Sequence, residues 1–156
     1  MKDKNYFAVD IDPVERERAE KRVKQKSMKN VSFFESVEQF LGTEHNNDEQ
    51  KVDVICTEVV EHMPINDAKL LIADICKANV GTLIVTTPDA RFNDNYFMEG
   101  MRHYDHDWEP TKQEFVDFMY EALEMPNDRI DIADWFEIGD IVDGVSPSQG
   151  MIVKFK

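Results

Sequence analysis

Short apolar runs alternate with longer polar or amphipathic stretches along this chain. The runs have the length and composition of buried strands and lie at Tyr6–Val9, Val31–Phe34, Val52–Thr57 and Thr82–Thr87. Between them, residues 14–26 and 66–78 place apolar positions at helical spacing. Because strands separated by helices usually form a parallel sheet covered by those helices, the pattern predicts an α/β fold with a mostly parallel sheet.

Local signals sharpen the boundaries of these elements. Asp12 followed by Pro13 predicts the cap and the first turn of the first helix. Thr111 opens a capping-box pattern, and the apolar positions that follow it predict another helix. The last two runs, 130–138 and 151–155, are joined by a loop rich in Gly, Pro and Ser, so they predict an antiparallel pair at a sheet edge.

The composition indicates one domain, spanning residues 1–156, and the 2 cysteines fall where core residues are expected. No apolar run is long enough to cross a bilayer and no signal-peptide pattern opens the chain, so we expect a cytoplasmic protein with no membrane partner. The net charge of −14 argues against tight, unspecific binding to a nucleic-acid backbone. A local site where a metal supplies positive charge remains compatible with this charge.

Two clusters of carboxylates and imidazoles stand out as candidate chemistry. Glu58, Glu61 and His62 follow a predicted strand directly, at the carboxyl end where open α/β sheets place their ligands. The second cluster, residues 102–106, lies in the segment 89–109, which has no sustained period, and such long irregular segments tend to be functional. The two clusters together predict one metal site, whose mixed nitrogen and oxygen ligands favour Mn²⁺, Fe²⁺ or Co²⁺ over Mg²⁺.

Simpler interpretations of the same residues stay open at this point. Glutamate and histidine after a strand are common as helix caps and surface residues, which is a structural explanation of the first cluster. In the second cluster, Arg102 and Asp105 have the spacing of a plain ion pair that holds a loop, as well as of a substrate contact.

Three segments of the chain carry a resemblance to a known family. They are residues 56–63, residues 84–93, and residues 102–109 with Thr111, Lys112, Glu114 and Phe115. In this order and at these separations they resemble the RNA 3′-terminal 2′-O-methyltransferases, which modify plant microRNAs and animal piwi-associated RNAs and act in bacteria beside an RNA-repair kinase and ligase. The resemblance covers residues 5–155 and implies a Rossmann-like class I methyltransferase fold with a C-terminal antiparallel strand pair.

The resemblance also implies an activity and a metal site. The reaction is transfer of a methyl group from S-adenosyl-L-methionine to the 2′-hydroxyl of the 3′-terminal nucleotide of RNA, with a divalent metal, Mn²⁺ or Mg²⁺. Carried over by position, the metal ligands are Glu58, Glu61, His62 and His106. Candidate catalytic residues are His62 and His103 as proton acceptors and Arg102 as a substrate contact. Partners implied by the family are the RNA 3′ end and proteins of RNA-repair or small-RNA pathways.

The cofactor-binding residues follow from the same resemblance. Asp10, at the end of the first predicted strand, is expected to accept hydrogen bonds from the ribose hydroxyls of the cofactor. Contacts to the adenine are expected at Glu35, Ser36 and Val37, after the next strand.

The chain departs from the family pattern most clearly at its beginning. The family starts with a strand and a glycine-rich turn, whereas this chain opens at what corresponds to the second strand and has no glycine before Gly42. We therefore expect a methyltransferase domain that lacks the first strand, and a polypeptide that supplies the glycine-rich segment is a candidate partner. Two alternatives stay open: a non-catalytic, metal-binding pseudo-methyltransferase that acts as a partner subunit, and a methyltransferase for a small diol-bearing metabolite.

Overall fold

The computed structural model describes residues 4–47, 49–96 and 100–156. The chain forms two compact units, residues 1–47 and 48–156, and each is described by itself. None of the helices in the described ranges is long and apolar enough to cross a bilayer.

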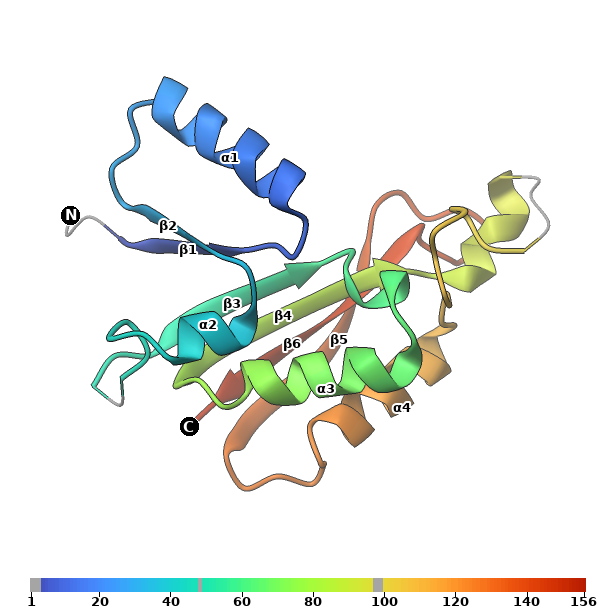
Figure 1. The fold of residues 1–156 in the computed structure, drawn as a ribbon. Helices are drawn as coiled ribbons and strands as arrows, with labels where there is room; N and C mark the ends of the chain where they lie inside the picture. Colours follow the sequence, from blue (N-terminus) through green and yellow to red (C-terminus); the bar gives the residue numbers. More distant parts are fainter. Residues whose placement is uncertain (1–3, 48, 97–99) are drawn as a thin grey trace. The chain divides into compact units, whose positions relative to one another are not determined.

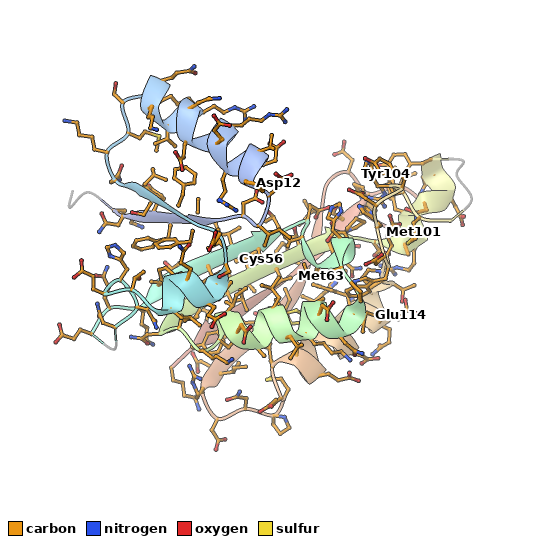
Figure 2. The ribbon with its side chains drawn as sticks, viewed as in Figure 1. Asp12, Cys56, Met63, Met101, Tyr104 and Glu114 are labelled. Atoms are coloured by element: carbon orange, nitrogen blue, oxygen red, sulfur yellow. The ribbon has the colours of Figure 1, made fainter. Side chains whose placement is uncertain are left out.

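The first unit is a two-stranded parallel sheet with two helices. Its elements are β1 (Tyr6–Val9), α1 (Pro13–Gln25), β2 (Val31–Phe34) and α2 (Val37–Leu41). Asp12, labelled at the start of α1 in Figure 2, caps that helix by accepting from the Val14 N–H at 2.7 Å, which confirms the predicted cap. The core of the unit is aromatic, since Phe7, Phe34 and Phe40 pack with ring centroids 5.2 to 6.2 Å apart.

The second unit contains a four-stranded mixed sheet. Its elements are β3 (Val52–Thr57), the 3-10 turn η1 (Val60–His62), α3 (Ile65–Ile75), β4 (Val80–Pro88), the 3-10 segment η2 (Ala90–Tyr96), α4 (Lys112–Ala122), β5 (Ile130–Ile138) and β6 (Ser148–Phe155). The strand order is β3-β4-β6-β5, as Figure 1 shows. Strands β3 and β4 are parallel, whereas β6 is antiparallel to both of its neighbours.

The strand pairings agree with the predicted fold class. Among the described residues, β1–β2 and β3–β4 are parallel, and both antiparallel pairings, β4–β6 and β5–β6, involve the C-terminal strands, so only the four-stranded sheet is mixed. The C-terminal pair is antiparallel and lies at one edge of the four-stranded sheet, as predicted; within the pair, β5 is the edge strand and β6 lies between β4 and β5. A short loop between β5 and β6 allows only an antiparallel return, since a parallel strand needs a longer crossover.

The core of the second unit lies between this sheet and the two longer helices. Helices α3 and α4 pack against each other, and α4 also packs against β6. The side chains at the centre are at most 1% exposed and come from β4, β6, α3 and α4: Leu83, Val85, Met151, Val153, Ala68, Ile72, Phe115 and Met119. This core supports the carboxyl ends of β3 and β4, where the candidate residues lie.

Helix α4 begins with the predicted capping box. The Thr111 N–H donates to the Glu114 carboxylate at 2.8 Å, and the Glu114 N–H donates back to the Thr111 hydroxyl at 3.5 Å. Glu114 is labelled in Figure 2 at this first turn. The hydrogen bonds from Thr111 also lower the pKa of Glu114.

A Thr111→Ala variant should lose about 1 kcal/mol of unfolding free energy, because it removes the hydroxyl that caps α4. Urea unfolding followed by tryptophan fluorescence reports on this unit, since Trp108 and Trp135 both lie in it. Thr111→Ser keeps the hydroxyl and should retain most of the stability; an equal loss in both variants would show that the cap is not the cause.

Candidate metal centre

The turn after β3 is held to the neighbouring strand by Glu58. This residue has a φ of 52°, a left-handed conformation that is uncommon outside glycine. The Glu58 N–H donates to the Thr86 carbonyl at 3.1 Å, and the Thr86 hydroxyl donates to Glu58 Oε1 at 2.9 Å. These bonds tie the start of the turn to β4 and direct the following residues into η1.

Glu61, in η1, is a fully buried carboxylate. It is 0% exposed, and neither of its oxygens has a hydrogen-bond partner in the described part of the chain. Burial raises the pKa of Glu61 to about 7, and the charge of Glu58 adds a smaller increase. The backbone N–H of Glu61 itself and the Thr87 hydroxyl oppose this increase in pKa, although neither reaches hydrogen-bond geometry with the carboxylate. A buried carboxylate without a partner is costly, so this position fits a group that contacts a bound cation.

Two hydrogen bonds join the segment before α4, which carries the second cluster, to η1. The Asp107 N–H donates to the Glu61 carbonyl at 2.8 Å, and the indole Nε1 of Trp108 donates to the Val60 carbonyl at 2.8 Å. Trp108 is held in turn by packing against Phe118 of α4, with ring centroids 4.9 Å apart. These contacts place the second cluster, residues 102–106, beside the first, which contains Glu61 and His62.

Three of the four predicted metal ligands meet as a result. Glu61, His62 and His106 each offer a ligand atom, and these atoms lie within 4.8 Å of one another. The rings of His62 and His106 are 4.7 Å apart, edge to face. One carboxylate and two imidazoles form a donor set that suits a divalent transition metal.

The fourth predicted ligand, Glu58, is not part of this group of atoms. Its carboxylate accepts the Thr86 hydroxyl, although it lies close enough to raise the pKa of Glu61. The role of Glu58 as a ligand therefore stays a prediction.

Asp105 links His62 to His103, a contact that the sequence analysis did not predict. Its Oδ2 lies 3.3 Å from Nδ1 of His62, and its Oδ1 meets Nδ1 of His103. The hydrogen bond with His103 lowers the pKa of Asp105. The predicted ion pair between Arg102 and Asp105 is not among the contacts of the described residues, because Asp105 pairs with imidazoles instead.

Glu109 is a buried carboxylate that contacts His106. Its Oε1 lies 2.5 Å from Nδ1 of His106, and the two side chains are 2% and 7% exposed. Glu109 also accepts from Asn93 Nδ2 at 2.5 Å and from the Arg102 N–H at 2.5 Å. Burial alone would raise the pKa of Glu109, but these hydrogen bonds outweigh it and hold the pKa below its usual value.

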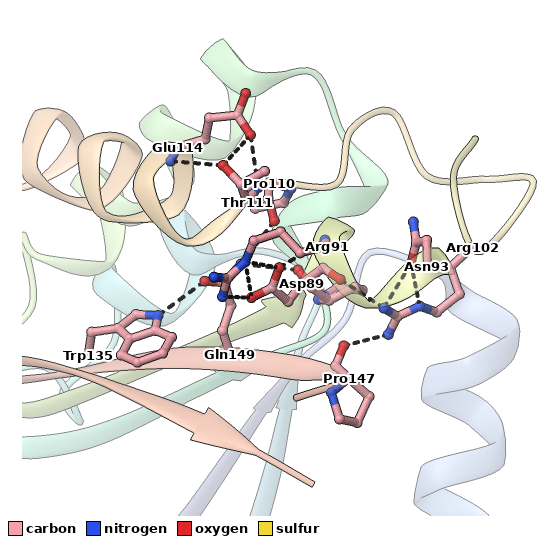
Figure 3. Close-up of polar contacts among 11 residues, drawn as sticks. Asp89, Arg91, Asn93, Arg102, Pro110, Thr111, Glu114, Trp135, Pro147 and Gln149 are labelled. Atoms are coloured by element: carbon pink, nitrogen blue, oxygen red, sulfur yellow. Dashed lines mark hydrogen bonds and ion pairs between the residues drawn. The ribbon is translucent and has the colours of Figure 1, made fainter. Parts of the chain in front are cut away.

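Arg102 has its guanidinium engaged by the protein itself. It donates to Asn93 Oδ1 at 2.9 and 3.1 Å, to the Pro147 carbonyl at 2.6 Å and to the Asp89 carbonyl at 3.1 Å. Figure 3 shows these bonds joining the irregular segment to the end of β4 and to the loop before β6. They indicate that Arg102 holds the loop, and they lend no support to its predicted role as a substrate contact.

The predicted cofactor residues all lie in the first unit, around the ends of β1 and β2. Asp10 accepts from the Asp12 N–H at 2.9 Å, and Ser36 caps α2 by accepting from the Gln39 N–H at 3.1 Å. Glu35 and Val37 flank this cap. These local contacts explain the backbone around each residue, and the cofactor role of all four stays a prediction.

The fold is similar to that of class I S-adenosylmethionine-dependent methyltransferases. An S-adenosylmethionine-dependent methyltransferase from Clostridium acetobutylicum matches 97% of this chain, and 75% of its own length, with a TM-score of 0.64 at 13% identity. The predicted Rossmann-like α/β fold is therefore confirmed. No protein-family model and no curated protein matches the chain.

Within this class the chain is similar to Hen1. A chain in the structure of the Pnkp1/Rnl/Hen1 RNA repair complex matches 97% of this chain at 28% identity, with a TM-score of 0.76, over 32% of its own length. The small RNA methyltransferase HEN1 matches 96% of this chain at 23% identity, also with a TM-score of 0.76, over 20% of its own length. The resemblance inferred from the motifs is thereby confirmed, although this chain spans a third or less of those two proteins.

Proposed function

We propose that this chain serves metal-dependent transfer of a methyl group from S-adenosyl-L-methionine to the 2′-hydroxyl of the 3′-terminal nucleotide of RNA. The observation that carries the proposal is the buried Glu61 carboxylate, which has no hydrogen-bond partner in the part of the chain that the structure describes and lies beside His62 and His106. Its support is the likeness to a chain of an RNA repair complex and to a small RNA methyltransferase. In this proposal residues 1–156 act as one methyltransferase domain, and RNA-repair proteins are candidate partners.

We assign the divalent ion to Glu61, His62 and His106, with Glu58 as the predicted fourth ligand. Two imidazoles with carboxylates favour Mn²⁺ over Mg²⁺, because imidazole is a softer donor than oxygen. A bound ion would lower the pKa of a ribose hydroxyl that contacts it. A terminal ribose is the only one in an RNA chain that offers both a free 2′ and a free 3′ hydroxyl, which would explain selection for the 3′ end.

His103 is suited to accept the hydroxyl proton. Its side chain is 51% exposed, and its Nδ1 meets Asp105, so Nε2 is the ring nitrogen that would take up a proton. In the proposed reaction the bond between the 2′-oxygen and the methyl carbon would form as the sulfur–methyl bond breaks and S-adenosylhomocysteine leaves, and Nε2 of His103 would take up the proton. His62, the other predicted acceptor, is assigned to the metal.

We assign the cofactor to the first unit. Asp10 is an exposed carboxylate directly after a parallel strand, where such groups accept hydrogen bonds from ribose hydroxyls. Glu35, Ser36 and Val37 follow the neighbouring parallel strand and complete the predicted contacts to the adenosine part.

Calorimetric titrations of this chain test the proposal in two steps. The first titration is with Mn²⁺ alone, which should bind. The second is with S-adenosylhomocysteine, which should bind both in the presence of Mn²⁺ and after chelation, because the predicted cofactor residues lie in a different unit from the metal residues. Radiolabelled methyl groups should pass to RNA with a terminal 2′,3′-diol and not to the same RNA with a 2′-deoxy end.

The other outcomes separate the alternatives. Metal binding without binding of S-adenosylhomocysteine would favour one of two alternatives: a methyltransferase domain that needs a glycine-rich segment from another polypeptide, or a non-catalytic, metal-binding pseudo-methyltransferase. Transfer to a small diol but not to RNA would favour the metabolite methyltransferase. Absence of Mn²⁺ binding would contradict the assignment of Glu61, His62 and His106.

A further inference from the structure

Both candidate metal-binding imidazoles have one ring nitrogen occupied by a carboxylate. Nδ1 of His106 lies 2.5 Å from Glu109, and Nδ1 of His62 lies 3.3 Å from Asp105. A neutral imidazole has one N–H and one lone pair, so a hydrogen bond at one nitrogen decides which nitrogen can bind a metal. A carboxylate that accepts a hydrogen bond from Nδ1–H therefore leaves the lone pair of Nε2 as the metal ligand in each ring.

The contact between His106 and Glu109 is shielded from solvent far better than the contact between His62 and Asp105. Glu109 and His106 are both almost fully buried, whereas Asp105 and His62 are 46% and 38% exposed. Asp105 is also shared, because its other oxygen meets His103. Solvent competes for a contact of this kind, so we expect Asp105 to exert weaker control over His62 than Glu109 exerts over His106.

Glu109 is itself held in place from two directions. Asn93, in η2, donates to one oxygen of the carboxylate, and the backbone N–H of Arg102 donates to the other. The Asn93 side chain is fixed in turn, because its carbonyl oxygen accepts from the Arg102 guanidinium. With these donors in place Glu109 stays an acceptor for the N–H of His106.

We propose that Glu109 is a positioning residue for the candidate metal centre, because its fixed carboxylate holds His106 as the Nδ1–H tautomer and leaves Nε2 as the metal ligand. The proposal rests on the metal role assigned to His106 above. It also assigns a role to Asn93 and Arg102, which orient the carboxylate rather than contact a substrate.

Nitrogen NMR of the metal-free protein tests the tautomer directly. The chain has 4 histidines, so signals of ¹⁵N-labelled rings are assignable by single substitutions. At pH 8 the His106 ring should show a protonated Nδ1 and an unprotonated Nε2. An Nε2–H tautomer in the unsubstituted protein would overturn the proposal, whether or not the protein binds metal.

Substitution of Glu109 provides the second readout. In Glu109→Gln the amide N–H can turn towards Nδ1 of His106, which favours the Nε2–H tautomer. The Nδ1–H signal of His106 should therefore be lost, and Mn²⁺ affinity should fall roughly 10- to 100-fold. Glu109→Asp keeps the acceptor and should restore part of the signal. Asp105→Asn should weaken Mn²⁺ binding less, and Glu124→Gln, on an exposed residue after α4, should leave both readouts unchanged.

The two readouts separate the failure of this inference from the failure of the proposed function. A protein that shows the Nδ1–H tautomer, loses it on Glu109→Gln, and binds no Mn²⁺ would support the positioning contact and contradict the metal centre. Unchanged tautomer and unchanged Mn²⁺ affinity in a folded Glu109→Gln variant would contradict the positioning role. If that variant does not fold, the tautomer of the unsubstituted protein still decides.

Discussion

A Glu61→Gln variant should be more stable than the unsubstituted protein at pH 8 when divalent metal is removed. Glu61 is buried and finds no hydrogen-bond partner for its carboxylate among the described residues, and burial raises its pKa from 4.5 to about 7. An acid whose pKa is raised by folding destabilises the fold once it is ionised, so stability falls as the pH rises from 4.5 through 7. The full effect above pH 7 is on the order of 3 kcal/mol, and glutamine removes the charge that causes it.

Urea unfolding with excess chelator at pH 5 and at pH 8 measures this effect. The stability difference between the two proteins should be much smaller at pH 5 than at pH 8, because the folded carboxyl is still protonated at pH 5. Glu124→Gln is the matched control, because Glu124 is an exposed carboxylate of the same unit and its substitution should change stability little at either pH. A Glu61→Gln protein that is less stable at pH 8 would mean that the carboxylate has a structural partner and is no vacant ligand.

A His106→Ala variant should lose Mn²⁺ binding while keeping its fold. In the part of the chain that the structure describes, His106 is buried and shares the candidate metal site with Glu61 and His62. Its loss would leave one carboxylate and one half-exposed imidazole. We expect Mn²⁺ affinity to fall by at least about 100-fold. Mn²⁺ should raise the melting temperature of the unsubstituted protein, because it binds the folded state, and should not raise that of the variant.

Calorimetry and thermal unfolding with and without Mn²⁺ check this expectation. His45→Ala is the matched control, because His45 lies in the first unit, where its ring packs 4.9 Å from that of Phe7. That variant should bind Mn²⁺ normally even if it loses some stability. Equal Mn²⁺ affinity in the His106→Ala variant and the unsubstituted protein would remove His106 from the site.

Much of the fold was predictable because its signals are local. The strands at Tyr6–Val9, Val31–Phe34 and Val52–Thr57 have the predicted bounds, since each is a short apolar run ended by turn or cap residues. The caps at Asp12 and Thr111 form as expected, because a cap needs only a side chain and the first turn of its own helix. Helix α2 was not predicted, since its 5 residues are too short to show a helical period.

The position of β6 could not be predicted in the same way. The sequence shows an apolar run after a Gly/Pro/Ser loop, which indicates an antiparallel pair but not which member lies at the edge. That choice depends on packing over the whole second unit, where Met151 and Val153 of β6 are buried opposite the centre of β4. Strand order of this kind depends on contacts between residues far apart in sequence.

For the candidate site, the sequence by itself determined which residue types are present and where. Glu61 and His62 follow a strand, and His106 belongs to a motif, so all three were named without a structure. Only the tertiary structure decided that these three meet, that Glu61 is buried without a hydrogen-bond partner among the described residues, and that Glu58 accepts a hydrogen bond from Thr86. The physical reason is that burial and ring orientation are set by long-range contacts, such as the bond from the Asp107 N–H to the Glu61 carbonyl, which no local pattern records.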